Sequence, residues 1–173
     1  MTAARDCPAC GAGRPAPLFV KDGHAMVRCA DCGCVYLAQD PATIDFQALY
    51  GESYYTGGSD AVFADYVGQE AARRAQARRK LWLLRHLPPR LPAAGRLLDV
   101  GCAAGFFLAE AKRFYEVQGV ELSTWSSAYA RERLGLPVIT GTLQQAALPE
   151  ASFDVITLWD VIEHVPDPVP LLT

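Results

Sequence analysis

Four cysteines near the start of the sequence have the spacing of a metal site. Cys7 and Cys10 form one Cys-x-x-Cys motif and Cys29 and Cys32 form a second, each followed by glycine, and eighteen residues lie between Cys10 and Cys29. Two cysteines at this spacing can reach one ion from a tight turn, and four thiolates complete a tetrahedral shell. The sequence therefore predicts a structural zinc ion bound by these four residues. A disulfide or redox pair, and iron of the rubredoxin type, are the alternatives.

A second group of residues has the pattern of a nucleotide-binding turn. Residues 96–105 (RLLDVGCAAG) pass from an apolar run through Asp99 into small residues, and a helix is expected from Phe106. Small residues let the backbone approach a ligand closely, and a helix start offers free N–H groups. The next apolar run, residues 117–121, ends in Glu121. That is about 20 residues after the turn, where nucleotide-binding folds place the carboxylate that binds ribose.

Three motifs in this order resemble those of the class I S-adenosylmethionine-dependent methyltransferases. Residues 98–105 (LDVGCAAG) resemble the family's first motif, residues 119–123 (GVELS) its ribose motif, and residues 152–168 (SFDVITLWDVIEHVPDP) its fourth-strand motif. The resemblance covers residues 95–173. It implies S-adenosylmethionine as the cofactor, and a small-molecule methyl acceptor such as a sugar or a natural-product intermediate.

The resemblance also implies a role for individual residues. Asp99 would order the glycine turn, Glu121 would hold the ribose, and Asp160 would lie near the methionine part. The implied cofactor-binding residues are Asp99, Gly101, Cys102, Ala103, Gly105, Glu121, Leu122, Thr142, Leu143 and Asp160.

His164 is the candidate catalytic residue. The resemblance places Glu163 and His164 on the acceptor side of the site, and an imidazole titrates in the range that a general base needs. Two alternatives stay open. His164 could cap a helix or bond the backbone, or Glu163 and His164 could hold a divalent metal ion.

The chain is expected to contain three segments. Residues 1–38 form a zinc ribbon with a hairpin turn at Asp22-Gly23, residues 39–92 form a connector and a helix, and residues 93–173 begin a Rossmann-like domain. The fold class is α/β, with a parallel sheet of strand order 3-2-1-4 and helices on both faces. The resembled fold has seven strands. We therefore expect a truncated domain, doubtful activity of this chain alone, and possible self-association through an exposed fourth strand.

The connector and the helix carry aromatic and basic residues. Tyr50, Tyr54 and Tyr55 could pack the ribbon against the main domain or close over a ligand. A helix is predicted over residues 60–87, capped by Ser59 or Asp60. We predict that its basic residues form a solvent-exposed face and not a surface that binds nucleic acid. They are Arg73, Arg74, Arg78, Arg79 and Lys80.

Composition narrows the class of protein. Hydrophobic residues make up 51% of the chain and charged residues 20%, and the net charge is −3. This balance is typical of a globular protein and argues against nucleic acid as a partner. No apolar run suggests a membrane partner or a secretory signal, so we expect a cytoplasmic protein. Two other functions compete with methyl transfer: a dinucleotide oxidoreductase, and a non-catalytic binding or scaffolding protein.

Overall fold

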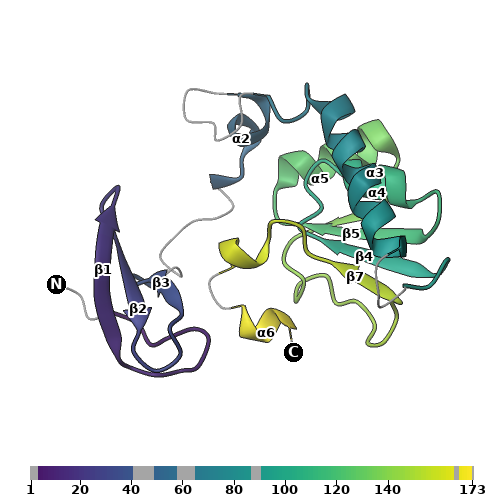
Figure 1. Ribbon diagram of the computed structural model, residues 1–173. Helices are drawn as coiled ribbons and strands as arrows, with labels where there is room; N and C mark the ends of the chain where they lie inside the picture. The colour runs from purple at the N-terminus through teal and green to yellow at the C-terminus, as the bar shows by residue number, and fades with distance from the viewer. Residues whose placement is uncertain (1–3, 41–48, 58–64, 87–90, 166–167, 173) are drawn as a thin grey trace. The chain divides into compact units, whose positions relative to one another are not determined.

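The computed structural model describes residues 4–40, 49–57, 65–86, 91–165 and 168–172. The chain divides into two units, which are residues 1–45 with 162–173, and residues 46–161. Figure 1 shows the elements of both units. Among the described helices, none is long and apolar enough to cross a membrane.

The first unit contains a three-stranded antiparallel sheet of order β1-β2-β3. Its strands are β1 (Pro15–Lys21), β2 (His24–Cys29) and β3 (Val35–Leu37). Asp22 and Gly23 connect β1 to β2 with φ angles of 51° and 80°, as a two-residue hairpin of type I′ requires. The predicted hairpin is therefore confirmed. The buried core of this sheet is small and consists of Cys7, Val27, Cys29 and Tyr36.

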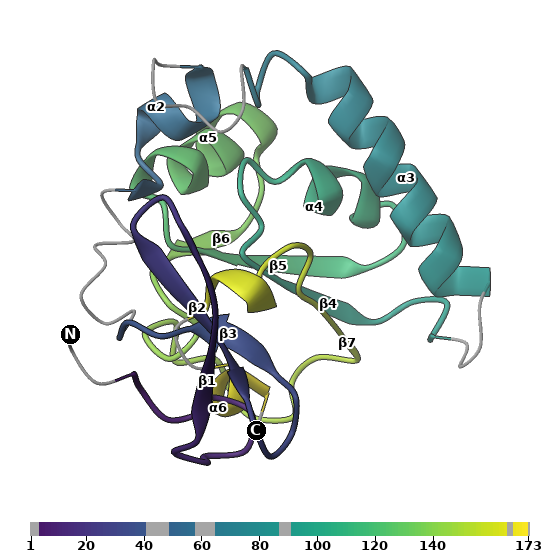
Figure 2. The ribbon, with the colours of Figure 1, turned by 60° about the vertical axis from the view of Figure 1, so that its left-hand side comes forward.

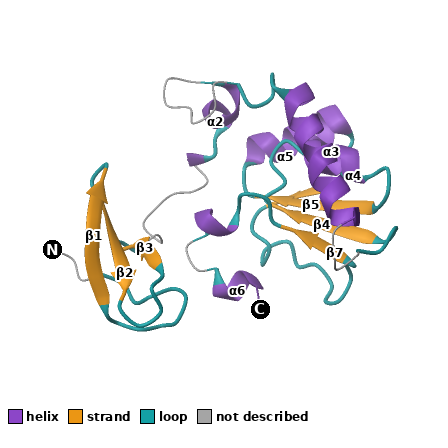
Figure 3. Ribbon diagram, viewed as in Figure 1, coloured by secondary structure: helices purple, strands orange, loops and turns teal. Residues whose placement is uncertain are grey.

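The second unit is built on a four-stranded parallel sheet (Figure 3). Its strands are β4 (Arg96–Val100), β5 (Glu116–Glu121), β6 (Val138–Thr140) and β7 (Val155–Thr157). The order β6-β5-β4-β7 is the predicted order 3-2-1-4. Within the described residues β7 is an edge strand, and the side chain of Ile156 on it is 57% exposed.

Helices lie over one side of the parallel sheet (Figure 2). They are α3 (Glu70–His86), α4 (Phe106–Ala111) and α5 (Thr124–Leu134). The connections through α4 and α5 run in one direction across the sheet, so right-handed crossovers place both on one face, and α3 packs against α4. The next connection, from β6 to β7, crosses the sheet in the opposite sense, because β7 pairs with β4 on the side away from β5. In the described chain it consists of turns and loop.

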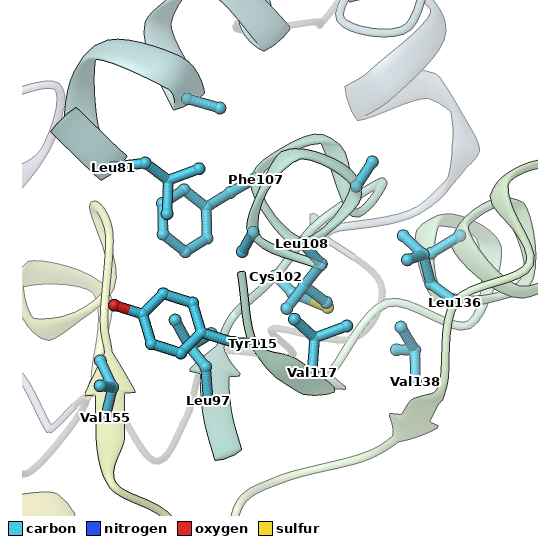
Figure 4. Close-up of a cluster of buried hydrophobic side chains, with 14 residues drawn as sticks. Leu81, Leu97, Cys102, Phe107, Leu108, Tyr115, Val117, Leu136, Val138 and Val155 are labelled. Atoms are coloured by element: carbon cyan, nitrogen blue, oxygen red, sulfur yellow. The ribbon is translucent and has the colours of Figure 1, made fainter. Parts of the chain in front are cut away.

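A single apolar cluster joins α3 and α4 to the sheet (Figure 4). Leu97 and Leu108 are fully buried, and Leu81 of α3 is 3% exposed. β4 is buried on both faces, as expected for a central parallel strand. The members of the cluster are Ala77, Leu81, Leu97, Cys102, Phe107, Leu108, Ala109, Ala111, Tyr115, Val117, Ala130, Leu136, Val138 and Val155.

Helix α5 begins at a serine cap and ends at a glycine in the left-handed conformation. Ser123 Oγ accepts a hydrogen bond from Ser126 N–H at 3.3 Å, and Gly135 ends the helix with φ 61°. Its buried face consists of small residues that let the helix lie close to the sheet: Ser126, Ser127 and Ala130.

Helix α3 starts later than predicted. Tyr66 and Val67 lie in turns, and both of their N–H groups point to the carbonyl oxygen of Tyr55, at 2.8 and 3.4 Å. Asp65 Oδ1 accepts from Gly68 N–H at 2.7 Å, which forms a local turn that competes with a helix. The predicted caps Ser59 and Asp60 lie outside the described residues.

Part of the basic stretch of α3 faces its own domain. Glu110 of α4 is 7% exposed, and its Oε1 lies 3.3 Å from Arg74 Nη1 and 3.4 Å from Arg78 Nη1. Arg73 lies over the ring of Tyr66, 4.2 Å from its centre. The expected solvated face is therefore wrong for Arg73 and Arg74, which are half-buried, whereas the side chain of Arg78 is 53% exposed.

The short helix α2 (Glu52–Thr56) brings the connector onto the second unit. Tyr55 is 4% exposed and stacks on Trp125 of α5, with ring centres 5.6 Å apart. Tyr66 stacks in turn on Phe106, at 5.8 Å. These rings therefore pack on the domain that carries the glycine turn.

Candidate functional site

The glycine turn follows β4 and requires left-handed backbone at three positions. Gly101, Ala103 and Gly105 have φ angles of 71°, 48° and 80°. A Cβ atom on Gly105 would lie 2.6 Å from Leu136 Cδ1, so crowding as well as backbone conformation demands glycine there. Ala103 takes the same conformation at a cost, since it carries a Cβ.

Glu121 fixes this turn from the end of β5. Its Oε2 accepts from Ala103 N–H and its Oε1 from Ser123 N–H, each at 2.8 Å. The side chain is 6% exposed. Burial raises the pKa of Glu121, and the two backbone donors oppose that rise. Each oxygen keeps a lone pair, so the carboxylate can accept further hydrogen bonds.

Asp99 lies beneath the turn, on β4. It is 2% exposed, and Thr157 Oγ1 donates to its Oδ1 at 2.6 Å. Burial raises the pKa of Asp99 to about 7, while the Thr157 hydroxyl and the charge of Lys80 act against the rise. Asp99 thus joins β4 to β7, and its role in ordering the turn stays a prediction.

The predicted adenine-side residues follow β5 and β6. Leu122 is half-buried after β5, and Leu143 is half-buried after β6. Thr142 is exposed and closes a local turn, because its N–H donates to Gln145 Oε1 at 2.8 Å and its Oγ1 accepts from Gln145 N–H at 3.2 Å. All three lie at the carboxyl ends of strands, where open α/β sheets bind ligands.

Cys102 has a packing role. Its side chain is 5% exposed, and a Cβ atom on Gly119 would lie 2.7 Å from its Sγ. Its role in binding a cofactor stays a prediction. The same crowding explains why β5 carries glycine at position 119, which the motif alone does not reveal.

Asp160 follows β7 and has a partner that the sequence did not suggest. Its Oδ2 lies 3.5 Å from Lys80 Nζ of α3. The two residues are far apart in the sequence, so no motif connects them. His164 and Glu163 lie on the 3₁₀ helix η2 (Ile162–His164), are exposed and belong to the first unit. Their catalytic role stays a prediction.

The four cysteines of the ribbon converge. Cys7 Sγ lies 3.6 Å from Cys32 Sγ, and Cys10 Sγ lies 3.7 Å from Cys29 Sγ. All four sulfur atoms lie within 4.8 Å of one another. Four thiolates at about 2.3 Å from one zinc ion would have sulfur atoms about 3.8 Å apart. The arrangement therefore fits a tetrahedral ion.

The surroundings of the cysteines favour the thiolate form at Cys7 but not at Cys10 or Cys32, whose pKa values are raised by neighbouring thiols and by burial. Gly11 and Gly33 follow the two motifs with φ 73° and 77°. Burial disfavours the Cys7 thiolate, but hydrogen bonds from the backbone of Ala9 and Cys10 and from neighbouring thiols lower the pKa of Cys7 to about 6. Cys34 is half-buried and packs beside the ribbon core, outside the group of four sulfur atoms.

Residues 70–173 match a protein family described as a methyltransferase domain. The chain belongs to this family. It is 42% identical over 84 residues to the ubiquinone biosynthesis O-methyltransferase of Azoarcus sp. (strain BH72), covering 44% of this chain and 36% of that protein. It is 38% identical over 98 residues to the same-named enzyme of Thiobacillus denitrificans (strain ATCC 25259 / T1), covering 51% and 42%.

Solved methyltransferases are also similar to this domain. Streptomyces venezuelae DesVI has a TM-score of 0.44 and 27% identity, covering 54% of this chain and 39% of that one. CalS10, an amino pentose methyltransferase from Micromonospora echinaspora, has a TM-score of 0.42 and 26% identity, covering 59% and 44%. The chain spans about two fifths of the length of the curated relatives described above, 36% and 42%.

Proposed function

We propose that this methyltransferase domain binds S-adenosylmethionine and that the protein transfers the methyl group to a small-molecule acceptor. The observation that carries the proposal is the Glu121 carboxylate, which is 6% exposed and bonds the N–H of Ala103 in the glycine turn. A buried carboxylate tied to a small-residue turn can accept from the two hydroxyls of a ribose.

The residues present fit the nucleoside and methionine parts of such a ligand. Glu121 has unused lone pairs, Gly101 and Gly105 keep side chains away from the turn, and Leu122 and Leu143 offer apolar surface for an adenine. When bound, the sulfonium group supplies an electrophilic methyl carbon and a good leaving group. The protein must orient that carbon toward the acceptor and exclude water.

For an oxygen or nitrogen acceptor, the protein must also take up a proton. We propose His164 as the general base, because an imidazole side chain can take up a proton in the neutral range where such catalysis operates. A small-molecule acceptor is supported by the curated relatives, whose names assign them to ubiquinone biosynthesis. A pH–rate profile that loses its acidic limb in His164→Gln would support this role, and an unchanged profile would contradict it.

Glu121→Gln is the sharpest test of the nucleoside site. Removing the charge should weaken binding of S-adenosylhomocysteine about tenfold or more by calorimetry, because hydrogen bonds to charged groups are the stronger ones. Glu116→Gln is the matched control, since Glu116 begins the same strand with its side chain 77% exposed. Equal affinity of Glu121→Gln and the unchanged protein would place the ribose elsewhere.

Two alternative functions have distinct outcomes. A binding or scaffolding protein would bind the adenosyl ligand without turnover of any acceptor. A dinucleotide oxidoreductase would bind NADH in place of S-adenosylhomocysteine, and the spacing of Gly101 and Gly105, four residues apart, disfavours it. Methyl transfer from labelled S-adenosylmethionine separates these outcomes.

We also propose that the ribbon binds one structural zinc ion through Cys7, Cys10, Cys29 and Cys32. The mutual approach of the four sulfur atoms supports this, and four thiolates leave no open position for catalysis. Elemental analysis should find about one zinc per chain. A folded ribbon without metal would contradict the proposal.

Two further expectations stay predictions. Self-association through β7 would pair an edge strand that carries the exposed Ile156, and sedimentation at several protein concentrations tests it. A cytoplasmic location is the other expectation, and imaging in cells tests it.

A further inference from the structure

Ser126 carries a buried hydroxyl group that lacks a partner. The residue lies in the first turn of α5 and is 0% exposed. Its N–H donates to Ser123 Oγ at 3.3 Å, but its own Oγ is buried without a hydrogen-bond partner in the described parts of the chain. A hydroxyl group that leaves water without gaining a hydrogen bond destabilises the folded state. Such a group therefore requires an explanation.

The hydroxyl group lies between the nucleoside site and the connector helix α2. Burial raises the pKa of Glu121, and the Ser126 hydroxyl opposes that rise. Burial and the charge of Glu121 raise the pKa of Tyr55, and the Ser126 hydroxyl opposes that rise as well. One short side chain of α5 therefore faces a carboxylate from β5 and a phenol from α2.

Both neighbours of the hydroxyl group are held in place by other contacts. The Glu121 carboxylate accepts from two backbone N–H groups, each at 2.8 Å. Tyr55 is 4% exposed and stacks on Trp125, with ring centres 5.6 Å apart. A serine hydroxyl rotates and both donates and accepts, so it can accept from the phenol while it donates to the carboxylate.

A ribose needs this carboxylate charged and fixed in direction. The ribose hydroxyls are donors, and their hydrogen bonds are stronger to a charged acceptor than to a neutral one. Burial works against the charge of Glu121, so a donor beside the carboxylate favours ligand binding. The unpartnered hydroxyl group thus lies where a ligand would benefit from it, and local costs of this kind are retained at functional sites.

We propose that Ser126 is a positioning residue of the nucleoside site and that Tyr55 acts through it. When the ribose binds, the Ser126 hydroxyl donates to the Glu121 carboxylate, and the Tyr55 hydroxyl donates to Ser126 Oγ. The proposal deepens the proposed function and rests on it. It gives Tyr55 of the connector a part in ribose selection beyond its packing on α5.

The test compares two ligands that differ only in the ribose. S-adenosylhomocysteine carries both ribose hydroxyls, and its 2′,3′-dideoxy analogue lacks them. Calorimetry measures the affinity for each ligand, and urea unfolding measures stability. The variants are Ser126→Ala, Tyr55→Phe and the double variant. Ser127→Ala is the matched control, because Ser127 is also 0% exposed but its Oγ pairs with Thr140 Oγ1 at 2.7 Å.

Ser126→Ala should weaken S-adenosylhomocysteine about fivefold and change the affinity for the dideoxy analogue less than about twofold. It should unfold at the same or a higher urea concentration than the unchanged protein, because it removes an unpaired buried group. Ser127→Ala should unfold at a lower concentration and keep the preference for the ribose. Tyr55→Phe keeps the stacked ring and should weaken S-adenosylhomocysteine about twofold, with no further loss in the double variant, because coupled residues are not additive.

Three results would overturn the positioning role. They are equal losses for the two ligands in Ser126→Ala, no loss for either ligand, and a ribose-selective loss in Ser127→Ala. Additive losses in the double variant would show that Tyr55 does not act through Ser126. If Glu121→Gln loses S-adenosylhomocysteine and Ser126→Ala does not, the positioning role fails while the proposed function stands. If the unchanged protein does not bind S-adenosylhomocysteine, the proposed function itself fails.

Discussion

The two sheets of this protein are held together by different means. The ribbon has a buried core of four residues, two of which are cysteines, and β1 is exposed at nearly every position. The parallel sheet has a core that includes residues from α3, α4 and all four of its strands. A small sheet cannot bury enough apolar surface to offset the entropy of folding. We therefore expect metal to stabilise the first sheet and apolar burial the second.

Removing the metal should show most clearly that the two sheets are stabilised by different means. Cys29 is 1% exposed, and binding of a structural zinc ion can supply about 10–16 kcal/mol of folding free energy. Cys29→Ser, or a chelator, should unfold the ribbon and make its remaining thiols reactive. All three tryptophans lie in the second unit, so the denaturant midpoint measured by tryptophan fluorescence should not change.

Cys34→Ser is the control for that experiment. Cys34 lies beside the ribbon core but outside the group of four sulfur atoms. The variant should keep its zinc and its protected thiols. If Cys34→Ser lost zinc as readily as Cys29→Ser, the ligand set would have to be revised.

A cavity in the core of the parallel sheet should destabilise that sheet and leave the ribbon folded. Leu97 is fully buried on β4, so Leu97→Ala should lower the free energy of unfolding by about 2–5 kcal/mol, from lost burial and an unfilled cavity. Tryptophan fluorescence in urea measures this loss, and thiol reactivity should show an intact ribbon. Ile156→Ala on β7 is the control, because its side chain is 57% exposed. Equal losses at the two positions would mean that burial does not set the stability of this sheet.

Turns and helix ends that depend on neighbouring residues can be predicted from local signals in the sequence. The Asp22-Gly23 hairpin, the Ser123 cap and the Gly135 end of α5 each follow from residues that are neighbours along the chain. The order of the parallel strands followed from the resemblance. Glu121 and the turn were identified because a fixed spacing connects them.

Contacts between distant segments were missed, for physical reasons. Helix α3 begins late because Tyr55, far from it in sequence, accepts two N–H groups that a longer helix would use. Lys80 meets Asp160 across 80 residues, and Arg74 and Arg78 meet Glu110 in the same way. Periodicity places a charged residue on a helix face, but only packing decides whether that face meets solvent or another helix.

The buried acid of the second sheet should make its stability depend on pH. The pKa of Asp99 is raised from 3.8 to about 7, so between these values the folded state holds a proton that the unfolded state has released. The free energy of unfolding should therefore fall as pH rises from about 4 to about 7, by at most about 4 kcal/mol. Asp99→Asn cannot ionise and should flatten this part of the curve, measured by urea unfolding at each pH.

Glu121 contributes in the same direction, because burial raises its pKa as well. A residual slope in Asp99→Asn is therefore expected, and the difference between the two curves measures Asp99. Parallel curves would show that Asp99 keeps an ordinary pKa in the folded protein.

The smallest effect concerns the turns of the two sheets. In the ribbon, glycine occupies the left-handed positions after both cysteine motifs, at Gly11 and Gly33, whereas the second sheet places Ala103 at φ 48°. Left-handed backbone costs a residue with a Cβ about 1–2 kcal/mol. Replacing alanine by glycine also lowers the free energy of unfolding by about 0.4–1 kcal/mol, because glycine gives the unfolded chain more conformational entropy. Ala103→Gly should therefore raise the free energy of unfolding by about 0.5–1 kcal/mol in urea. Ala104→Gly, at a neighbouring residue that is fully buried and outside the left-handed region, should lower it. If both substitutions were destabilising, the strain at Ala103 would be offset by contacts of its methyl group.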